Sequence, residues 1–267
     1  MGYDQAERWC GEIGEAARAA GRIMLEARDI RSRASGKEGH ANFVTEYDRQ
    51  VQDMLFARLS KIVPEAAFIG EENGADRVGE DSRTGYAFCV DPIDGTSNFM
   101  TGYRPSMTSI ALMKDGRPYI GVVYNPYADL MFTAVKGQGA FENGMRILSS
   151  PEPLSGSLVS FGTSPYNSEY TEKTFDMCRY YLPRCIDLRR SGSAAWDLAM
   201  LARGDTGLFF ECSLGLWDFA APGLIATEAG CVLTNIEGKE LSWRGRSSVM
   251  CASRGVARED YLYPGMK

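Results

Sequence analysis

The segment that decides the fold reads Asp91-Pro92-Ile93-Asp94-Gly95-Thr96-Ser97-Asn98-Phe99, directly after the apolar run Tyr86-Ala87-Phe88-Cys89-Val90. The apolar run is typical of a buried strand, so we expect the two carboxylates to lie where that strand ends and the backbone turns. Two hard oxygen ligands at such a corner suit Mg²⁺, which proteins hold through few carboxylates together with water and substrate phosphate. Gly95 permits a positive φ, so we expect the backbone N–H groups of residues 95–97 to face an anion.

The composition is that of a globular protein without a nucleic-acid or membrane surface. The chain has 267 residues, 44% hydrophobic and 24% charged, which allows one large domain or two closely packed halves. The net charge is −6, and no basic cluster is longer than Arg189-Arg190, so we expect no nucleic-acid partner. We also expect no membrane association, because the N-terminus lacks a signal-peptide core and no apolar run approaches the roughly 20 residues that span a bilayer.

The numbers and positions of cysteine and histidine residues argue against several kinds of site. The seven cysteines are scattered singly without a C-x-x-C pair, which indicates a reducing cytoplasm and no disulfides. His40 is the only histidine, which argues strongly against a histidine-based zinc site and against a Ser-His-Asp triad.

Helical and strand patterns interleave along the chain. Apolar residues recur at helical spacing from about residue 4 to 29 and again from 51 to 62, and strand patterns with turn-like connections follow from 86 to 135. Pro151-Glu152-Pro153 is the best boundary between an N-terminal half, 1–150, and a C-terminal half, 151–267. Because hairpins are frequent, a mixed layered α/β sandwich fits better than a purely parallel sheet.

Three acidic segments end strand-like runs: Gly70-Glu71-Glu72, Asp91 to Asp94, and Leu216-Trp217-Asp218. Taken alone, an acidic pair after a strand is usually a solvated turn. Glu71 and Glu72 are adjacent and point in different directions, so we expect at most one of them to be a direct ligand. Asp218 is expected to open a helix, where N-capping alone would explain an aspartate, although one carboxylate can both cap and bind a metal.

The segment differs from the D-x-D-G-T motif of phosphatases that use an aspartyl nucleophile. The residue two places before Asp94 is Pro92, which offers no nucleophile, and Asp91 would face the other side of the strand. That mechanism is therefore excluded.

Four motifs in order give the chain a clear resemblance to the inositol monophosphatase family of lithium-sensitive, Mg²⁺-dependent phosphatases. They are Val44-Thr45-Glu46-Tyr47-Asp48, Phe68-Ile69-Gly70-Glu71-Glu72, the segment from Asp91 to Phe99, and the segment from Trp217 to Gly230. The resemblance implies an α/β (α+β) fold, a layered αβαβα sandwich of the sugar-phosphatase type. It also implies that 1–150 carries most metal ligands and that 151–267 carries Asp218 and the substrate contacts.

The resemblance further implies two or three Mg²⁺ ions and a hydrolytic mechanism without a phosphoenzyme. The implied metal ligands are Glu71, Asp91, the Ile93 carbonyl, Asp94 and Asp218. Metal-activated water would attack the phosphorus in line, with Glu71, Thr96 and Asp48 as the catalytic residues; Thr96, bonded to Asp48, would orient or deprotonate the water. The backbone of Gly95, Thr96 and Ser97 would hold the phosphate oxygens.

On the substrate side, Gly192, Ser193 and Ala194 resemble a helix start that faces substrate hydroxyls in the family, and a plain N-cap at Ser193 is the alternative. Glu211 matches a glutamate that hydrogen-bonds an inositol hydroxyl, and Ser164 is a further match. Lys37 aligns with a loop lysine near the metals, but for both Lys37 and His40 a solvated surface position is the simpler interpretation.

The expected reaction is hydrolysis of a small polyol phosphate, with myo-inositol 1-phosphate first and histidinol phosphate or fructose 1,6-bisphosphate as alternatives. Asn98 stands where nucleotide-phosphate relatives tend to have Glu, which disfavours a nucleotide, and Thr101 replaces a histidine of many animal relatives. The resemblance implies a cytoplasmic homodimer. A partner-binding protein that retains the fold is the alternative of a different class, since some bacterial relatives contact the transcription machinery.

Overall fold

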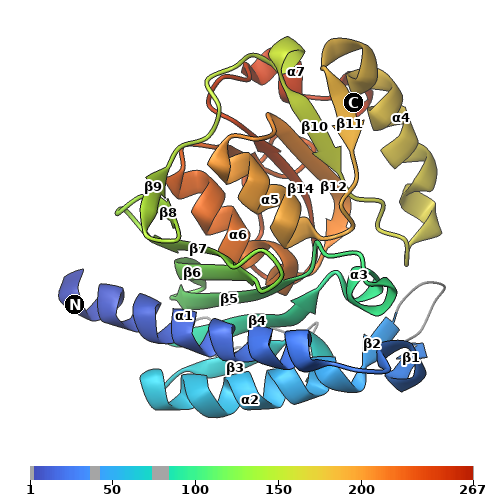
Figure 1. Ribbon diagram of the computed structural model, residues 1–267. Coiled ribbons are helices and arrows are strands. Elements are labelled where there is room, and N and C mark those ends of the chain that lie inside the picture. The colour runs from blue at the N-terminus through green and yellow to red at the C-terminus, as the bar shows by residue number, and fades with distance from the viewer. Residues whose placement is uncertain (1–2, 37–42, 74–83, 267) are drawn as a thin grey trace.

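The structure, a computed structural model, describes residues 3–36, 43–73 and 84–266, and the predicted loop residues Lys37 and His40 lie outside these ranges. Helices and sheets alternate in five layers (Figure 1). The layers are α1 (Tyr3–Glu26) with α2 (Glu46–Ile62), a seven-stranded sheet, α5 (Ala194–Arg203) with α6 (Leu216–Glu228), a five-stranded sheet, and α4 (Thr171–Tyr181). The predicted αβαβα sandwich is confirmed.

The seven-stranded sheet has the order β3-β4-β5-β6-β7-β8-β9. Only β3 and β4 pair in parallel; the other neighbours are antiparallel, as the hairpin patterns predicted. The strands are β3 (Ala67–Gly70), β4 (Tyr86–Asp94), β5 (Met107–Lys114), β6 (Arg117–Asn125), β7 (Leu130–Val135), β8 (Ala140–Glu142) and β9 (Met145–Ile147).

The five-stranded sheet has the order β11-β10-β12-β14-β13, with β10 parallel to both its neighbours and the remaining pairs antiparallel. Its strands are β10 (Leu158–Phe161), β11 (Asp187–Arg189), β12 (Leu208–Leu214), β13 (Val232–Thr234) and β14 (Ser247–Ala252). The smaller elements are β1 (Ala34–Gly36), β2 (Phe43–Thr45), α3 (Thr96–Thr101), α7 (Arg258–Tyr261) and short 3₁₀ turns, among them η2 (Glu71–Asn73). The two sheets fall on either side of residue 150, but the division into two halves remains a prediction.

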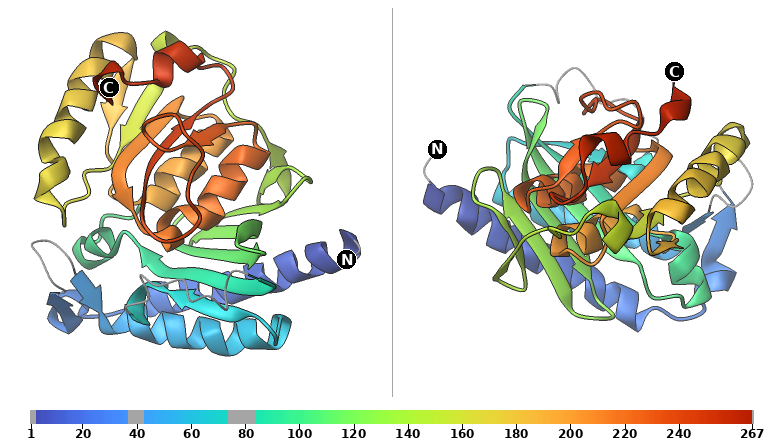
Figure 2. Two further views of the ribbon diagram at one scale, coloured as in Figure 1. Left: turned by 180° about the vertical axis from the view of Figure 1, so that it is seen from behind. Right: turned by 90° about the horizontal axis from the view of Figure 1, so that it is seen from above.

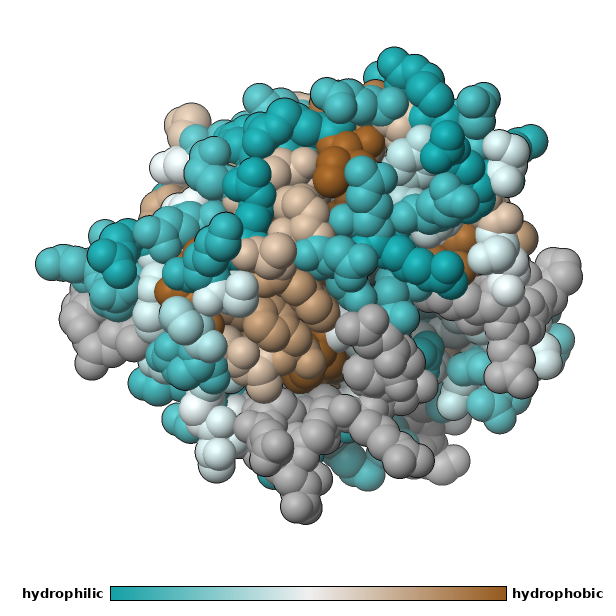
Figure 3. Space-filling model, turned by 90° about the horizontal axis from the view of Figure 1, so that it is seen from below, coloured by the Kyte–Doolittle hydropathy of each residue, from teal (hydrophilic) through white to brown (hydrophobic). Residues whose placement is uncertain are grey.

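The helices are placed by their apolar faces. Between the sheets, α6 is buried almost all round, from Leu216 to Ala226, because each side of it meets apolar side chains. In contrast, α1 buries one stripe, including Trp9 and Ile13, against the first sheet. The opposite side of α1 and α2 meets solvent: hydrophilic side chains cover most of that face, around a smaller apolar strip (Figure 3). The chain ends lie far apart, at α1 and near α4 (Figure 2).

No helix in the described part of the chain is long and apolar enough to cross a lipid bilayer. All seven cysteines are free thiols, in agreement with the prediction of no disulfides.

The close approach of α6 to β6 generates a stability prediction. A Cβ atom at Gly121 would lie 2.7 Å from the Ala221 carbonyl oxygen, so Gly121→Ala must push the helix from the sheet. We expect a loss of about 1–3 kcal/mol in the free energy of unfolding, measured by urea denaturation. Gly11→Ala is the matched control, because a Cβ on that position of α1 meets nothing within 4 Å and should stabilise the helix by about 1 kcal/mol. Equal stability of Gly121→Ala and wild type would contradict this packing.

Candidate active site

The sequence predicted that strand β4 ends before the first aspartate. Instead, the strand continues to Asp94 through a bulge. Asp91 is opposite Ser109 and Asp94 is opposite Met107, so three residue steps on β4 match two on β5. Pro92 has no N–H to give to a sheet ladder, and the bulge falls at this point. In a regular strand residues three apart face opposite sides, whereas the extra residue turns Asp91 and Asp94 toward the same side.

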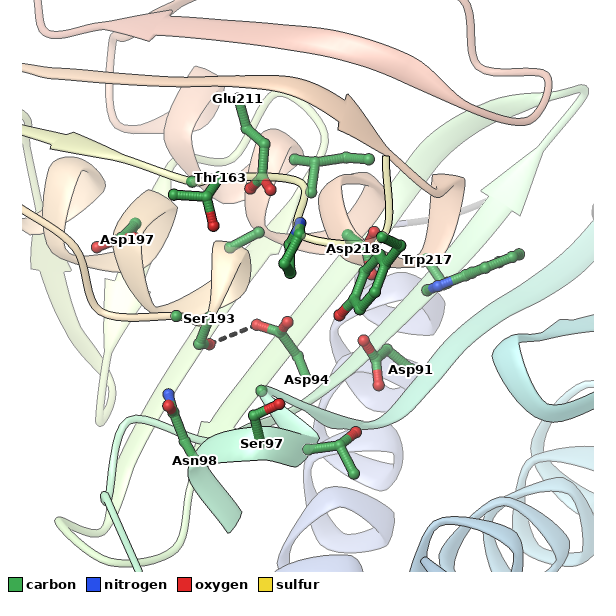
Figure 4. A pocket seen from close by; sticks show the side chains of 18 of the residues that line it. Asp91, Asp94, Ser97, Asn98, Thr163, Ser193, Asp197, Glu211, Trp217 and Asp218 are labelled. Carbon is green, nitrogen blue, oxygen red and sulfur yellow. Dashed lines mark hydrogen bonds between the residues drawn. The ribbon is translucent and has the colours of Figure 1, made fainter. Parts of the chain in front are cut away.

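A third carboxylate, Asp218, reaches the same place from α6. Oxygen atoms of Asp91, Asp94 and Asp218 lie within 4.8 Å of one another, and Figure 4 shows the three side chains directed into one space. The helix begins at Leu216, two residues earlier than predicted, so Asp218 is not its N-cap. It accepts a hydrogen bond from the Gly215 N–H at 2.7 Å, which caps the helix from inside its first turn.

Burial and mutual repulsion make the carboxylate charges costly. Burial, followed by the neighbouring carboxylates, raises the pKa of Asp91 and of Asp218 well above the ordinary range. The pKa of Asp94 rises to about 6, because burial outweighs the hydrogen bonds that it accepts from Ser193 and the backbone. Among the described residues, no Lys or Arg forms an ion pair with any of these three aspartates. The group therefore has the charge and oxygen donors of a divalent-cation site.

Two further predicted ligands border the same cavity, which has a volume of about 250 Å³. Glu71 opens the 3₁₀ turn η2 directly after β3, and it lines this cavity whereas Glu72 does not. The Ile93 carbonyl accepts a hydrogen bond from Thr96 Oγ1 at 3.2 Å.

The residues Thr96 and Asp48 are in contact, as predicted. Thr96 Oγ1 lies 3.2 Å from Asp48 Oδ1, while the other oxygen of Asp48 accepts the Thr45 N–H at 2.7 Å. The Val44 to Asp48 motif is thus the capping box of α2, and it holds Asp48 behind the cavity wall. Burial raises the pKa of Asp48 to about 6, against the lowering effect of its bonds to Thr45.

The start of α3 forms one wall of the cavity. Gly95 adopts a positive φ of 83°, a conformation that we expected glycine to permit, and Gly95, Thr96 and Ser97 line the cavity. Asn98 joins this wall to the second half of the chain: its amide donates to the carbonyls of Pro105, at 2.5 Å, and Ser191, at 3.0 Å. Thr101 bonds the Ser97 carbonyl within its own helix.

The N-terminus of α5 contacts Asp94 directly. Ser193 is the N-cap, since its hydroxyl accepts the Trp196 N–H at 3.1 Å, and the same hydroxyl donates to Asp94 (Figure 4). The Ala195 N–H also donates to Asp94 at 2.7 Å. The predicted N-cap is confirmed, and Gly192, Ser193 and Ala194 all line the cavity.

At the far side of the cavity, a second bulge in β12 presents Glu211. Glu211 is opposite Val249 and Leu214 is opposite Ser247, so this strand also gains one residue. Glu211 Oε1 accepts the Ser164 N–H at 2.9 Å and the Ser164 hydroxyl at 3.2 Å. Ser164 is buried and does not line the cavity, so the structure places it behind Glu211.

The sequence reasoning missed several residues of the cavity wall, namely Thr163, Tyr166, Arg190, Asp197, Trp217 as a lining residue, and Arg246. Arg190 lies two residues before the helix start at Gly192, and this position could have indicated that it lines the cavity. Arg246 lies in a polar segment whose pattern indicates only a loop.

Comparison with known proteins agrees with this geometry. The model of the inositol monophosphatase family matches residues 6–263. The chain belongs to the inositol monophosphatase family.

Similar members of the family include an inositol-1-monophosphatase of Mesorhizobium japonicum, which is 34% identical over 84% of this chain and 84% of that protein. The Nus factor SuhB of Escherichia coli K12 is also 34% identical, over 84% of this chain and 83% of that protein. The crystal structure of the extragenic suppressor protein suhB from Bartonella henselae covers 92% of this chain and 93% of that chain, with 33% identity and a TM-score of 0.83. Membership in the inositol monophosphatase family places the chain among phosphatase-type hydrolases.

Glu228, in the motif from Trp217 to Gly230, has a structural role. Glu228, near the end of α6, accepts the N–H groups of Gly137 at 2.7 Å and Gly139 at 2.8 Å. It therefore fixes the turn between β7 and β8 to the helix that carries Asp218.

Glu211 generates a pH prediction. Burial raises its pKa to about 7 from an ordinary 4.5, so the stability contribution of the protonated form is complete below pH 4.5 and is lost as the pH rises through 7. In EDTA, the free energy of unfolding should fall between pH 5 and pH 8. This fall should be smaller in Glu211→Gln than in wild type, by up to roughly 3 kcal/mol. Glu259→Gln, which changes an exposed glutamate, should keep the wild-type pH dependence. Identical slopes for Glu211→Gln and wild type would refute the raised pKa.

Proposed function

We propose that the protein is a Mg²⁺-dependent phosphomonoesterase that hydrolyses a small polyol phosphate, with myo-inositol 1-phosphate the first substrate to test. The observation that carries the proposal is the convergence of three carboxylates, two buried and one partly buried, with the start of α3 in one cavity. The inositol-1-monophosphatase among the relatives supports the choice of substrate. Histidinol phosphate and fructose 1,6-bisphosphate are the alternatives within the same reaction class.

The residues present fit a hard divalent cation. The donor set consists of carboxylate oxygens and one carbonyl, from Glu71, Asp91, Ile93, Asp94 and Asp218, which suits Mg²⁺. Burial and the neighbouring carboxylates raise the pKa of Asp91 and of Asp218 well above the ordinary range, which supports a site that needs positive charge from a ligand. We propose that these five residues hold two or three ions. When bound, the ions would supply positive charge that activates water and stabilises the leaving oxygen.

The chain's own residues would position the reactants. The N–H groups of Gly95, Thr96 and Ser97 lie at the start of α3 and would donate to phosphate oxygens, whose charge is redistributed in the transition state. Thr96 Oγ1 would accept a hydrogen bond from the attacking water while it donates to Asp48 Oδ1, 3.2 Å away. A pKa of about 6 suits Asp48 as the final proton acceptor at neutral pH.

The opposite side of the cavity would hold the polyol. Glu211 ends in the cavity with one carboxylate oxygen fixed by Ser164, which leaves the other to accept a substrate hydroxyl. Ser193 and Ala194, at the start of α5, would contact the hydroxyl groups nearest the phosphate. We propose that Ser164 supports this contact from behind, because it touches Glu211 and not the cavity.

Partners and location follow from the same proposal. We expect a small-molecule substrate and no nucleic-acid substrate, and action in the cytoplasm, where the seven free cysteines would stay reduced. We expect a homodimer from the family resemblance. Relatives that carry the name Nus factor SuhB suggest partner binding as a different class of function. The intact carboxylate set supports catalysis instead, since uncompensated buried charges are costly to retain without a metal.

The metal site is tested by Asp94→Asn. The exchange removes one negative charge, so we expect phosphate release from myo-inositol 1-phosphate to fall roughly 100- to 1,000-fold. Mg²⁺ binding, measured by calorimetry, should weaken in parallel. Asp53→Asn on the exposed face of α2 is the control and should match wild type in both measurements. Wild-type turnover by Asp94→Asn would show that the site is misassigned.

The role of the Thr96 hydroxyl between the attacking water and Asp48 is tested by Thr96→Val. Loss of the hydroxyl should lower kcat by roughly 100-fold or more with little change in KM, because the change affects the attacking water and not the binding of substrate. Thr101→Val alters a hydroxyl on the same short helix that bonds only helix carbonyls, and it should leave kcat within about twofold. If Thr96→Val and Thr101→Val both changed kcat only slightly, Thr96 would be excluded from proton transfer.

A further inference from the structure

A second cavity, with a volume of about 580 Å³, lies between α1 and the strands β7 and β8. It shares no lining residue with the active-site cavity, and the proposed reaction does not use it. Cys10, Gly11 and Gly14 border it on the helix side, and Phe141 of β8 borders it on the sheet side. The volume is in the range of cavities that hold small organic molecules.

Two glycines of α1 create this space. A Cβ atom at Gly11 would meet nothing within 4 Å, and one at Gly14 would only touch the end of the Met131 side chain, at 4.0 Å. Packing within the chain therefore requires neither glycine, although glycine destabilises a helix interior relative to alanine. A larger side chain at either position would fill part of the cavity.

The floor of the cavity is apolar. Met131, Thr133 and Val135 occupy alternate positions of β7 and so face the same side, and Phe141 pairs with Thr133 across β7 and β8. The Thr133 hydroxyl forms a hydrogen bond with the Cys10 thiol, so the only polar group among these four side chains already has a partner. Phe141 remains partly exposed, so an aromatic or alkyl group would bury apolar surface here.

The rim of the cavity is acidic. Glu7 and Glu15 of α1 border it, and Arg18 is the only basic residue among those that line it. Arg18 is already engaged, since its Nη1 lies 2.8 Å from Asp129 Oδ1 and its Nε lies 3.9 Å from Glu15 Oε1. Within the part of the chain that the structure describes, Glu7 forms no ion pair. The unbalanced charge at this rim is therefore negative.

The charge of Glu7 reaches the floor of the cavity. Burial first, and Glu7 in addition, raise the pKa of Cys10 to about 11, against the lowering effect of the Thr133 hydroxyl. Lys136, in the turn after β7, and Arg146, on β9, do not line the cavity. An anion in the cavity would therefore be repelled by Glu7, whereas an ammonium group would be attracted to it.

We propose that this cavity binds a small organic cation, whose protonated amine pairs with Glu7 at the rim and whose aromatic or alkyl body packs on Met131, Val135 and Phe141. The cavity is separate from the active site, and the proposal does not depend on the phosphatase function proposed above.

Two fluorescent probes of similar size test the role of charge. Dansylcadaverine carries an aromatic group, a five-carbon chain and an ammonium group, whereas N-dansyl-6-aminohexanoate has the same aromatic group and chain with a carboxylate at the end. In fluorescence titrations, wild type should bind the cationic probe about five- to tenfold more tightly than the anionic probe. Glu7→Gln should weaken binding of the cationic probe about threefold. Glu12→Gln changes the net charge equally at an exposed position of α1 outside the cavity, and it should bind both probes as wild type does.

Two variants test the cavity itself. Gly11→Leu and Gly14→Leu should fill it and weaken the binding of dansylcadaverine at least about tenfold, while urea denaturation shows that each variant is folded. If Gly14→Leu does not fold, Gly11→Leu decides, because a Cβ atom at Gly11 has no neighbour to displace. Neither change alters a residue of the active-site cavity, so undiminished binding by a folded leucine variant would overturn the proposed site.

Thiol labelling locates the bound probe. Of the seven cysteines, Cys10 and Cys185 are partly exposed and the other five are buried. Saturating dansylcadaverine should slow the modification of Cys10 by N-ethylmaleimide several-fold and leave Cys185 unchanged, as measured by mass spectrometry. Equal affinity of wild type for the two probes, or an unchanged rate at Cys10, overturns the proposal. Absence of probe binding by wild type, with a change in the oligomeric state of Gly11→Leu in light scattering, would assign the cavity to a second copy of the chain and would also overturn it.

Discussion

Repulsion among buried carboxylates is the constraint on which the site depends. Oxygen atoms of Asp91, Asp94 and Asp218 lie within 4.8 Å of one another, and the burial of Asp91 and Asp94 with the partial burial of Asp218 removes much of the water that would screen their charges. The chain offers each of them one or more backbone N–H groups: Ile93 donates to Asp91, Ala195 to Asp94 and Gly215 to Asp218. These hydrogen bonds fix the direction of each side chain, but neutral donors leave the net charge in place. A bound divalent cation would offset most of that charge.

Two bulges in the sheets place the acidic side chains at the cavity. The extra residue in β4 turns Asp91 and Asp94 to one side, and the extra residue in β12 presents Glu211 from the second sheet. Between the sheets, α5 and α6 bring their N-terminal ends to the cavity, with Ser193 on Asp94 and Asp218 within the first turn. The site therefore lies where both sheets and both central helices meet, so its accuracy depends on the packing of the whole sandwich.

Much of this arrangement was predictable from local pattern. Apolar periodicity located α1 and α2, the strand patterns located the β5 to β7 meander, and the four motifs located the acidic residues. The bulge at Pro92 was not predicted, because periodicity places side chains only along a regular strand. The anchoring of Asn98 to Ser191 and of Ser164 to Glu211 links residues far apart in sequence, and no local pattern records such partners. The strand β14 was missed because its short run, Ser247–Ala252, begins with two serines and follows a polar loop.

The central claim is that these carboxylates share a cation, and diffraction from crystals soaked in Mn²⁺ tests it most directly, since Mn²⁺ takes the same oxygen ligands as Mg²⁺ and scatters anomalously. We expect anomalous peaks in contact with carboxylate oxygens of Asp91, Asp94 and Asp218, which lie within 4.8 Å of one another. A cavity without anomalous density at saturating Mn²⁺, with the three side chains turned apart, would contradict the account.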